Sequence, residues 1–282
     1  MIEVPRSAIS GALASSAERL LSWAPAVDEA SGAEDVHHAR TAIRRLRADL
    51  RSFSPALLRR PVRSLRGELR WAGGILSRVR ELDVLLEQIE GAAADLPEDL
   101  AADAQRVCDR LRSERRTAWA VALGHLSGAR CRQLRAELEG LVTSPPFRAH
   151  ARLTSADLMR PAWRRLRRAV KAAATHPSEA ALHRVRIAAK RVRYAAEAVE
   201  PVVGTRAATF ARKAADLQDA LGARRDAVVA VDLLAEPAAT MDARGAYAAG
   251  ILAARCAAAR DRAAADIPRA WRRLAKRKRR FW

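Results

Sequence analysis

The chain has 282 residues, a formal net charge of +20 and only 4% aromatic residues. This length is enough for one large core or two small ones. Half of the residues are hydrophobic. Because aromatic residues are scarce, the core must consist mainly of Ala, Leu and Val, and such a core favours close-packed helices over sheets.

The excess of bases over acids indicates a polyanionic partner. Nearly all of the bases are Arg, and a guanidinium group binds phosphate oxygens through two parallel N–H groups. A general bias toward Ala and Arg in the source explains the choice of Arg over Lys equally well. Such a bias does not explain why bases outnumber acids.

The cysteines and the hydropathy pattern indicate the cellular compartment. Cys108, Cys131 and Cys256 are far apart and odd in number, so they match neither a disulfide framework nor a zinc-binding pattern. No apolar run approaches the roughly 18 residues that a membrane span requires. The N-terminus does not resemble a secretory signal peptide. We therefore expect a cytoplasmic protein.

Apolar residues at helical spacing, separated by Gly and Pro, predict helices throughout the first half of the chain. They are expected at residues 7–23, 34–53, 61–89, 98–123 and 130–142. The third of these helices is expected to bend at Gly73-Gly74. Ser144-Pro145-Pro146 is the strongest breaker, and it is expected to divide the chain into halves at residues 1–144 and 147–282.

The second half repeats this plan. Helices are expected at residues 156–174, 178–201, 206–221 and 225–236, and a long last helix is expected to start near Thr240 and bend at Pro268. Gly222 is expected to cap the helix before it. No alternating β-branched run and no hairpin turn dipeptide occurs. The sequence therefore predicts an all-α fold.

One basic helix occurs twice, at residues 36–47 and 182–193, with a period of about 146 residues. Each copy has an apolar residue, a His, a base three positions on, two bases seven and eight positions on, and another base ten positions on. On a helix, the His and most of these bases fall within about 80° of arc, and an apolar stripe lies about 120° away. The basic arcs consist of His37, Arg40, Arg44, Arg47 and Arg51, and of His183, Arg186, Lys190 and Arg193.

Each basic arc carries charge of a single sign. Like charges one turn apart repel by a few tenths of a kcal/mol per pair. A row of positive charge therefore needs a counter-ion, and an anionic polymer suits it best. The alternative for the bases is an ordinary solvated face, and for His37 and His183 it is a hydrogen-bonded structural role.

Two further motifs accompany the repeated helix, at residues 80–86 (RELDVLL) and 217–222 (LQDALG). Together with the two basic helices and the C-terminal segment 270–282, they resemble the CHAD family, the conserved histidine α-helical domain. The resemblance covers nearly the whole chain. Glu81 stands where the family usually has Asp, which keeps the charge.

The resemblance implies that residues 1–282 form one CHAD domain. It implies two pseudo-symmetric antiparallel helical bundles whose basic helices face each other across a basic central channel. It also implies that the ligand is inorganic polyphosphate and that the protein associates with polyphosphate granules. The expected contacts are His37, Arg40, Arg44, Arg47, His183, Arg186, Lys190 and Arg193, with Arg51, Arg63, Arg66 and Arg70 as secondary contacts.

No catalytic residue, metal site or cofactor is predicted, because no nucleotide loop, metal-ligand pattern or activated nucleophile is recognisable. Glu81, Asp83 and Asp226 are expected to pair with Arg78, Arg80 and Arg225. The main alternative function is binding to a nucleic-acid backbone, although few aromatic rings are present to stack on bases. The basic segment 272–280 could bind such a polyanion separately or belong to the same channel.

Overall fold

The computed structural model describes residues 2–23, 32–94, 96–238, 242–276 and 280–282, and the described residues form ten helices and no strand. The predicted all-α fold is confirmed. The helices are α1 Arg6–Trp23, α2 Ala33–Ser52, α3 Arg59–Ile75, α4 Ser77–Ala93, α5 Glu98–Leu126, α6 Ala129–Thr143, α7 Ser155–Thr175, α8 Glu179–Val203, α9 Thr205–Ala238 and α10 Ala243–Ala275.

Three of the expected helix boundaries are wrong. The predicted helix at 61–89 is divided into α3 and α4 at the buried Leu76. Helix α8 continues past Pro201 and ends at Gly204, whose φ of 73° favours glycine. Gly222 lies inside α9 rather than at its end. A glycine there costs roughly 1 kcal/mol relative to Ala, and the burial of Leu221 and Ala227 on either side outweighs this cost.

The helix-breaking signal at residues 144–146 and the start of α8 agree more closely with the sequence. Residues between α6 and α7 form a helix-free connection that includes Pro145 and Pro146. Ser178 caps α8, because its side chain accepts a hydrogen bond of 3.1 Å from the backbone N–H of Ala181. The expected start of the last helix near Thr240 lies outside the described residues.

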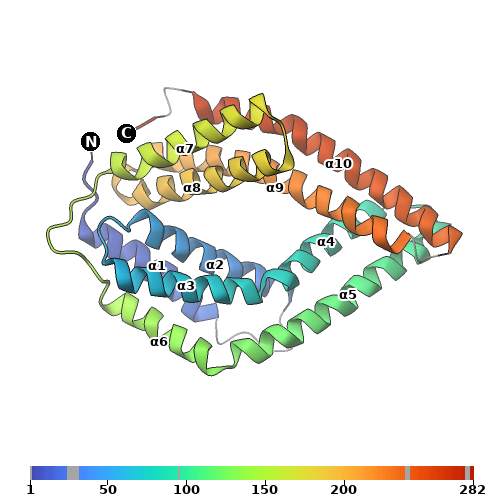
Figure 1. Cartoon of the computed structure of the whole chain (residues 1–282), viewed down its shortest axis with the longest axis horizontal. Coiled ribbons are helices and arrows are strands. Elements are labelled where there is room, and N and C mark those ends of the chain that lie inside the picture. The colour runs from blue at the N-terminus through green and yellow to red at the C-terminus, as the bar shows by residue number, and fades with distance from the viewer. Residues whose placement is uncertain (1, 24–31, 95, 239–241, 277–279) are drawn as a thin grey trace.

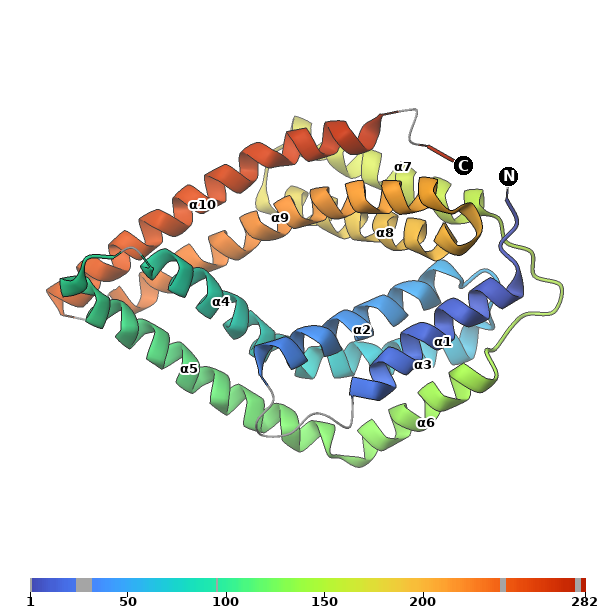
Figure 2. The same ribbon diagram turned by 180° about the vertical axis from the view of Figure 1, so that it is seen from behind.

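The two basic helices, α2 and α8, are the inner helices of two layers. Helices α1 and α3 flank α2 on one side, and α7 and α9 flank α8 on the other (Figure 1). Figure 2 shows the same arrangement from behind, with α5 and α10 as long outer edges that converge toward one end of the molecule. Contacts between α2 and α8 join the layers directly.

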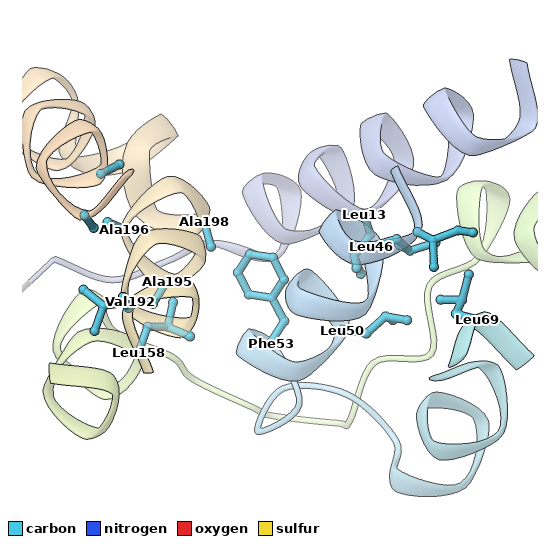
Figure 3. Close-up of a cluster of buried hydrophobic side chains, with 14 of the residues drawn as sticks. Leu13, Leu46, Leu50, Phe53, Leu69, Leu158, Val192, Ala195, Ala196 and Ala198 are labelled. Atoms are coloured by element: carbon cyan, nitrogen blue, oxygen red, sulfur yellow. The ribbon is translucent and has the colours of Figure 1, made fainter. Parts of the chain in front are cut away.

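Two hydrophobic clusters hold these layers together, and both combine residues from the two sides of residue 144. The larger cluster includes Phe53 at the end of α2 and Val192 and Ala198 of α8, all of which are buried. Figure 3 shows the Phe53 ring between α2 and α8, beside Ala198. Because the packing is continuous across the layers, the separation between α2 and α8 is fixed.

The second cluster lies where α4 and α5 meet α9 and α10, and it contains two of the free cysteines, Cys108 and Cys256. Helices α4 and α5 precede the Pro145-Pro146 connection, whereas α9 and α10 follow it. The cores therefore do not separate at that connection. No helix in the described part of the chain is long and apolar enough to cross a membrane.

Candidate anion-binding groove

A groove of about 610 Å³ lies between α2, α7 and α8. Its lining contains six bases and one carboxylate, that of Asp157. Asp157 already accepts hydrogen bonds from the backbone N–H and the hydroxyl of Thr154, at 2.9 and 2.7 Å, as part of the α7 cap. The six bases are Arg44, Arg47, Arg51, Arg165, Lys190 and Arg191.

The apolar stripes of the two basic helices explain why these bases meet. In α2 the stripe of Ile43, Leu46, Leu50 and Phe53 is buried. In α8 the stripe is also buried, and its residues are Val185, Ala189, Val192, Ala196 and Val199. Burial of each stripe fixes the rotation of its helix, so the arc beside the stripe faces the groove.

Burial and neighbouring positive charges lower the pKa values of Arg51 and Arg47 in the groove. The pKa of Arg51 is lowered to about 10 by burial and then by Arg191 of α8 and Arg66 of α3. Burial, together with Arg70 and Arg66 of α3, also lowers the pKa of Arg47. Arg47 and Arg51 therefore hold their protons less tightly than in water, because burial and the like charges around them both disfavour the charged form.

Several guanidinium groups have a buried N–H donor that lacks a hydrogen-bond acceptor. The Nε atoms of Arg44, Arg66, Arg186 and Arg191 are buried and have no hydrogen-bond acceptor among the described residues. A buried polar group without a partner costs roughly 1–3 kcal/mol. An anion that supplied oxygen acceptors here would remove that cost.

Lys190 is half-buried among positively charged side chains from both basic helices. It lines the groove, and its pKa is lowered to about 8 by burial and then by Arg186 and Arg44, although Asp226 acts in the opposite direction. The pKa of the Asp226 carboxyl is itself raised, mainly by burial. Arg186 and Asp226 thus lie close to Lys190 on the side toward α4 and α9.

The two repeated histidines lie outside the groove lining. His37 is half-buried, and burial followed by the charge of Arg80 lowers its pKa. His183 is exposed. Arg40 is half-buried, and it donates a hydrogen bond of 2.8 Å to the carbonyl oxygen of Gly73 in α3. Arg40 therefore also has a structural role, since it ties α2 to the end of α3.

Gly73 lies where α3 packs closely on α2. A Cβ atom at this position would lie 3.3 Å from Cγ2 of Ile43 in α2. The absence of a side chain lets the α3 backbone approach α2 closely enough to accept the Arg40 hydrogen bond. Of the glycine pair that suggested a bend, Gly73 thus lies in a close packing contact, whereas a Cβ atom at Gly74 would meet nothing within 4 Å.

Arg193 does not line the groove. Its Nε donates a hydrogen bond of 2.7 Å to Glu197 in the next turn of α8, and this ion pair raises the pKa of Arg193 despite its burial. Glu197 also pairs with Arg45 of α2. Arg45 in turn donates to Asp49 at 3.0 Å, and Asp49 is fully buried.

The two copies of the motif therefore use equivalent positions differently. Arg45 and Arg191 are equivalent, and so are Arg47 and Arg193, because each pair is separated by the same repeat period. In α2, Arg47 lines the groove and Arg45 pairs with Glu197. In α8, Arg191 lines the groove and Arg193 pairs with Glu197.

Arg191 and Arg165 are the groove residues that sequence reasoning missed. The sequence difference that could have indicated a role for Arg191 is Glu197. This acid occupies the position in the second copy at which the first copy has Arg51. An acid four residues after Arg193 favours an ion pair within the helix. Arg66 and Arg70 lie near Arg47, and Arg63 is exposed on the same arc of α3.

The predicted partners of the acidic residues are wrong in two cases. Asp83 pairs with Arg115 of α5 at 2.6 Å, and Arg78 pairs with Glu114 at 2.9 Å. Both pairs join α4 to α5 and are structural. Among the described residues, no group of three or more His, Cys, Asp or Glu side chains could hold a metal ion.

The described end of the C-terminal segment packs away from the groove. Arg280 lies 5.2 Å from the ring of Trp163 on α7, and that ring stacks on Trp271 at 5.6 Å. The Trp282 ring lies 5.1 Å from Phe210. The three residues 277–279 of the predicted basic tail lie outside the described part of the chain.

The family model of the CHAD domain matches residues 11–235. This chain belongs to the CHAD domain family. Members of the family are reported to bind polyphosphate, and the CHAD domain is in general a non-catalytic binding domain.

Two solved structures are similar over nearly the whole chain. One is "PptA from Streptomyces chartreusis", with 25% sequence identity and a TM-score of 0.76, covering 94% of this chain and 98% of that chain. The other is the CHAD domain from the plant Ricinus communis, with 25% identity and a TM-score of 0.72, covering 96% and 92%. None of the curated proteins matches this chain.

The ion pairs of Glu197 predict a stability effect. We expect Glu197→Gln to lower the free energy of unfolding by about 1–3 kcal/mol, because Arg45 and Arg193 would lose their shared carboxylate. Urea unfolding followed by circular dichroism measures this change. Glu200→Gln, on the exposed face of α8, is the control and should change stability by less than about 0.5 kcal/mol. Equal effects of the two substitutions would contradict this role of Glu197.

Proposed function

We propose that this protein binds inorganic polyphosphate in the groove between α2, α7 and α8. The observation that carries this proposal is the lining of the groove, in which six bases face one carboxylate that is already hydrogen-bonded. The reported binding of polyphosphate by other CHAD proteins supports the same ligand. The bases that repel one another in the free protein would each gain an acceptor oxygen.

The spacing of the bases suits a linear polyanion. Bases three or four residues apart on one face of a helix are separated by about 4.5–6 Å along its axis. Arg44, Arg47 and Arg51 of α2 form one such row, and Lys190 and Arg191 of α8 lie across the groove from it. A flexible chain with about one negative charge per unit can contact both rows at once.

The proposed contacts differ in part from those expected from the sequence. Arg44, Arg47, Arg51 and Lys190 are retained, and Arg191 and Arg165 are added. The other expected residues continue the basic surface beyond the groove, on the side of Lys190 or on α3, and we propose them as outer contacts. They are His37, Arg40, His183, Arg186, Arg63, Arg66 and Arg70. We do not retain Arg193, since its guanidinium is paired with Glu197.

The proposed cellular role is a non-catalytic one, in which the protein associates with polyphosphate granules. Nucleic acid is the competing polyanion. Among the described residues, Tyr194 alone contributes an aromatic ring to the groove lining, so bases would have little surface on which to stack. Polyphosphate should therefore displace RNA or DNA at a lower phosphate concentration than the reverse.

Charge reversal in the groove tests the proposed function. We expect Arg44→Glu/Lys190→Glu to weaken binding of long-chain polyphosphate by at least about 100-fold, since each lost charge-assisted contact contributes roughly 1.5–3 kcal/mol. Isothermal titration calorimetry at two salt concentrations measures the affinity. Binding to the wild type should fall steeply with salt, because counter-ions are released on association.

A matched control separates the groove from overall charge. Arg116→Glu/Arg262→Glu makes the same change in net charge at two exposed positions on α5 and α10. We expect this control to reduce affinity only a few-fold. If both double variants bind as tightly as the wild type, or lose affinity equally, the groove is not the site.

The position of Lys190 predicts a pH dependence of binding. Its pKa is about 8 in the free protein, and a bound polyanion would raise it by favouring the charged form. Binding above pH 8 would therefore require uptake of a proton. We expect affinity to fall by about tenfold or more between pH 7 and pH 9.5, which corresponds to a pKa rise of one unit or more.

Lys190→Arg isolates this effect. The ordinary pKa of arginine lies well above that of lysine, so the variant should keep more of its charge up to pH 9.5 and show a much smaller decrease in affinity than the wild type. Calorimetry in buffers with different ionisation enthalpies would count the protons taken up. The same pH dependence in wild type and variant would show that Lys190 does not titrate on binding.

A further inference from the structure

A second row of bases lies on the outer face of α7. Arg160, Arg164, Arg167 and Lys171 are spaced by three or four residues, and all four are exposed. Arg168 lies beside them, and none of the five forms an ion pair in the part of the chain that the structure describes. The only acid in α7 is Asp157, which is held in the helix cap.

This row is continuous with the groove. On the α7 helix, Arg168 lies between the outer row and Arg165, which lines the groove. From Arg160 to Lys171 the row is about 16 Å long. A chain that leaves the groove past Arg165 would therefore meet a base at each turn of the outer face.

Helix α7 carries this row, whereas its counterpart in the first half of the chain does not. Helix α1 is its counterpart in the first half, because each precedes a basic helix and packs on it. The exposed residues of α1 include Gly11, Ser15 and Glu18. The bases of α1 are Arg6, which donates to the carbonyl of Arg148, and Arg19, which donates to the carbonyl of Ser15. A general bias toward Arg would have placed bases on both helices.

We infer that the outer face of α7 is a second track for long-chain polyphosphate, which takes up the part of the chain that extends beyond the groove. The inference rests on the proposed function of the groove. The row is narrow, follows one helix and starts at the groove, which suits a single thin chain. A polyphosphate of a few units occupies the groove alone, whereas a long chain occupies the groove and the track together.

If the α7 row is a second track, substitutions in it should weaken the binding of long polyphosphate more than the binding of short polyphosphate. We expect Arg160→Glu/Arg164→Glu/Arg167→Glu to weaken binding of polyphosphate of about 100 units by at least tenfold, because three charge-assisted contacts are lost. The same variant should bind tripolyphosphate within about threefold of the wild type. Calorimetry with both ligands at one salt concentration provides the comparison. Circular dichroism verifies folding, which these exposed positions should not disturb.

The control variant has three charge reversals elsewhere on the surface, on α5, α6 and α10. They are Arg116→Glu/Arg132→Glu/Arg262→Glu. This control should change both affinities only slightly. The track is contradicted if the α7 variant binds the long chain like this control, or if it loses tripolyphosphate and long chain equally. Failure of the wild type to bind either ligand would overturn the proposed function of the groove itself, and with it the track.

Discussion

Mutual repulsion among the groove bases is the constraint on which the rest of the structure depends. The groove brings Arg44, Arg47, Arg51, Lys190 and Arg191 together, and the one carboxylate in its described lining, that of Asp157, is already hydrogen-bonded to Thr154, so the remainder of the fold must oppose their separation. The continuous packing around Phe53 between α2 and α8 does this. Placing like charges close together before the ligand arrives reduces the ordering that binding would otherwise require.

Glu197 is the second element that keeps the basic helices in register. Its carboxylate joins Arg45 of α2 to Arg193 of α8 beside the groove, and Arg45 extends the network to the buried Asp49 and, through Asp49, to Ser16 at 2.6 Å. One carboxylate thus links Arg45 of α2 to Arg193 of α8 and helps to fix the separation of the two helices. Removing it would leave Arg193 without this partner and Arg45 with Asp49 alone, and it would loosen the contact that positions the other bases.

The helical fold, the apolar stripes and most of the groove bases could be predicted from the sequence, because helical periodicity alone places Arg44 and Lys190 beside buried stripes. The role of Arg193 could not, since it depends on Glu197 and on a neighbouring helix that contributes Arg45. The helix ends predicted at Gly222 and Pro201 are wrong for a similar reason, because the packing of a long helix outweighs the local effect of one glycine or proline. The continuity of the outer row on α7 with the groove could not be predicted either, since it depends on the placement of Arg165.

The most direct test of the account is a crystal structure of the protein with a bound polyphosphate. Phosphate groups should lie between α2 and α8, with oxygens within hydrogen-bond distance of Arg44, Arg47, Lys190 and Arg191. The Arg193–Glu197 pair should remain intact in the complex. Phosphate density on another surface, with no density in the groove, would contradict the account.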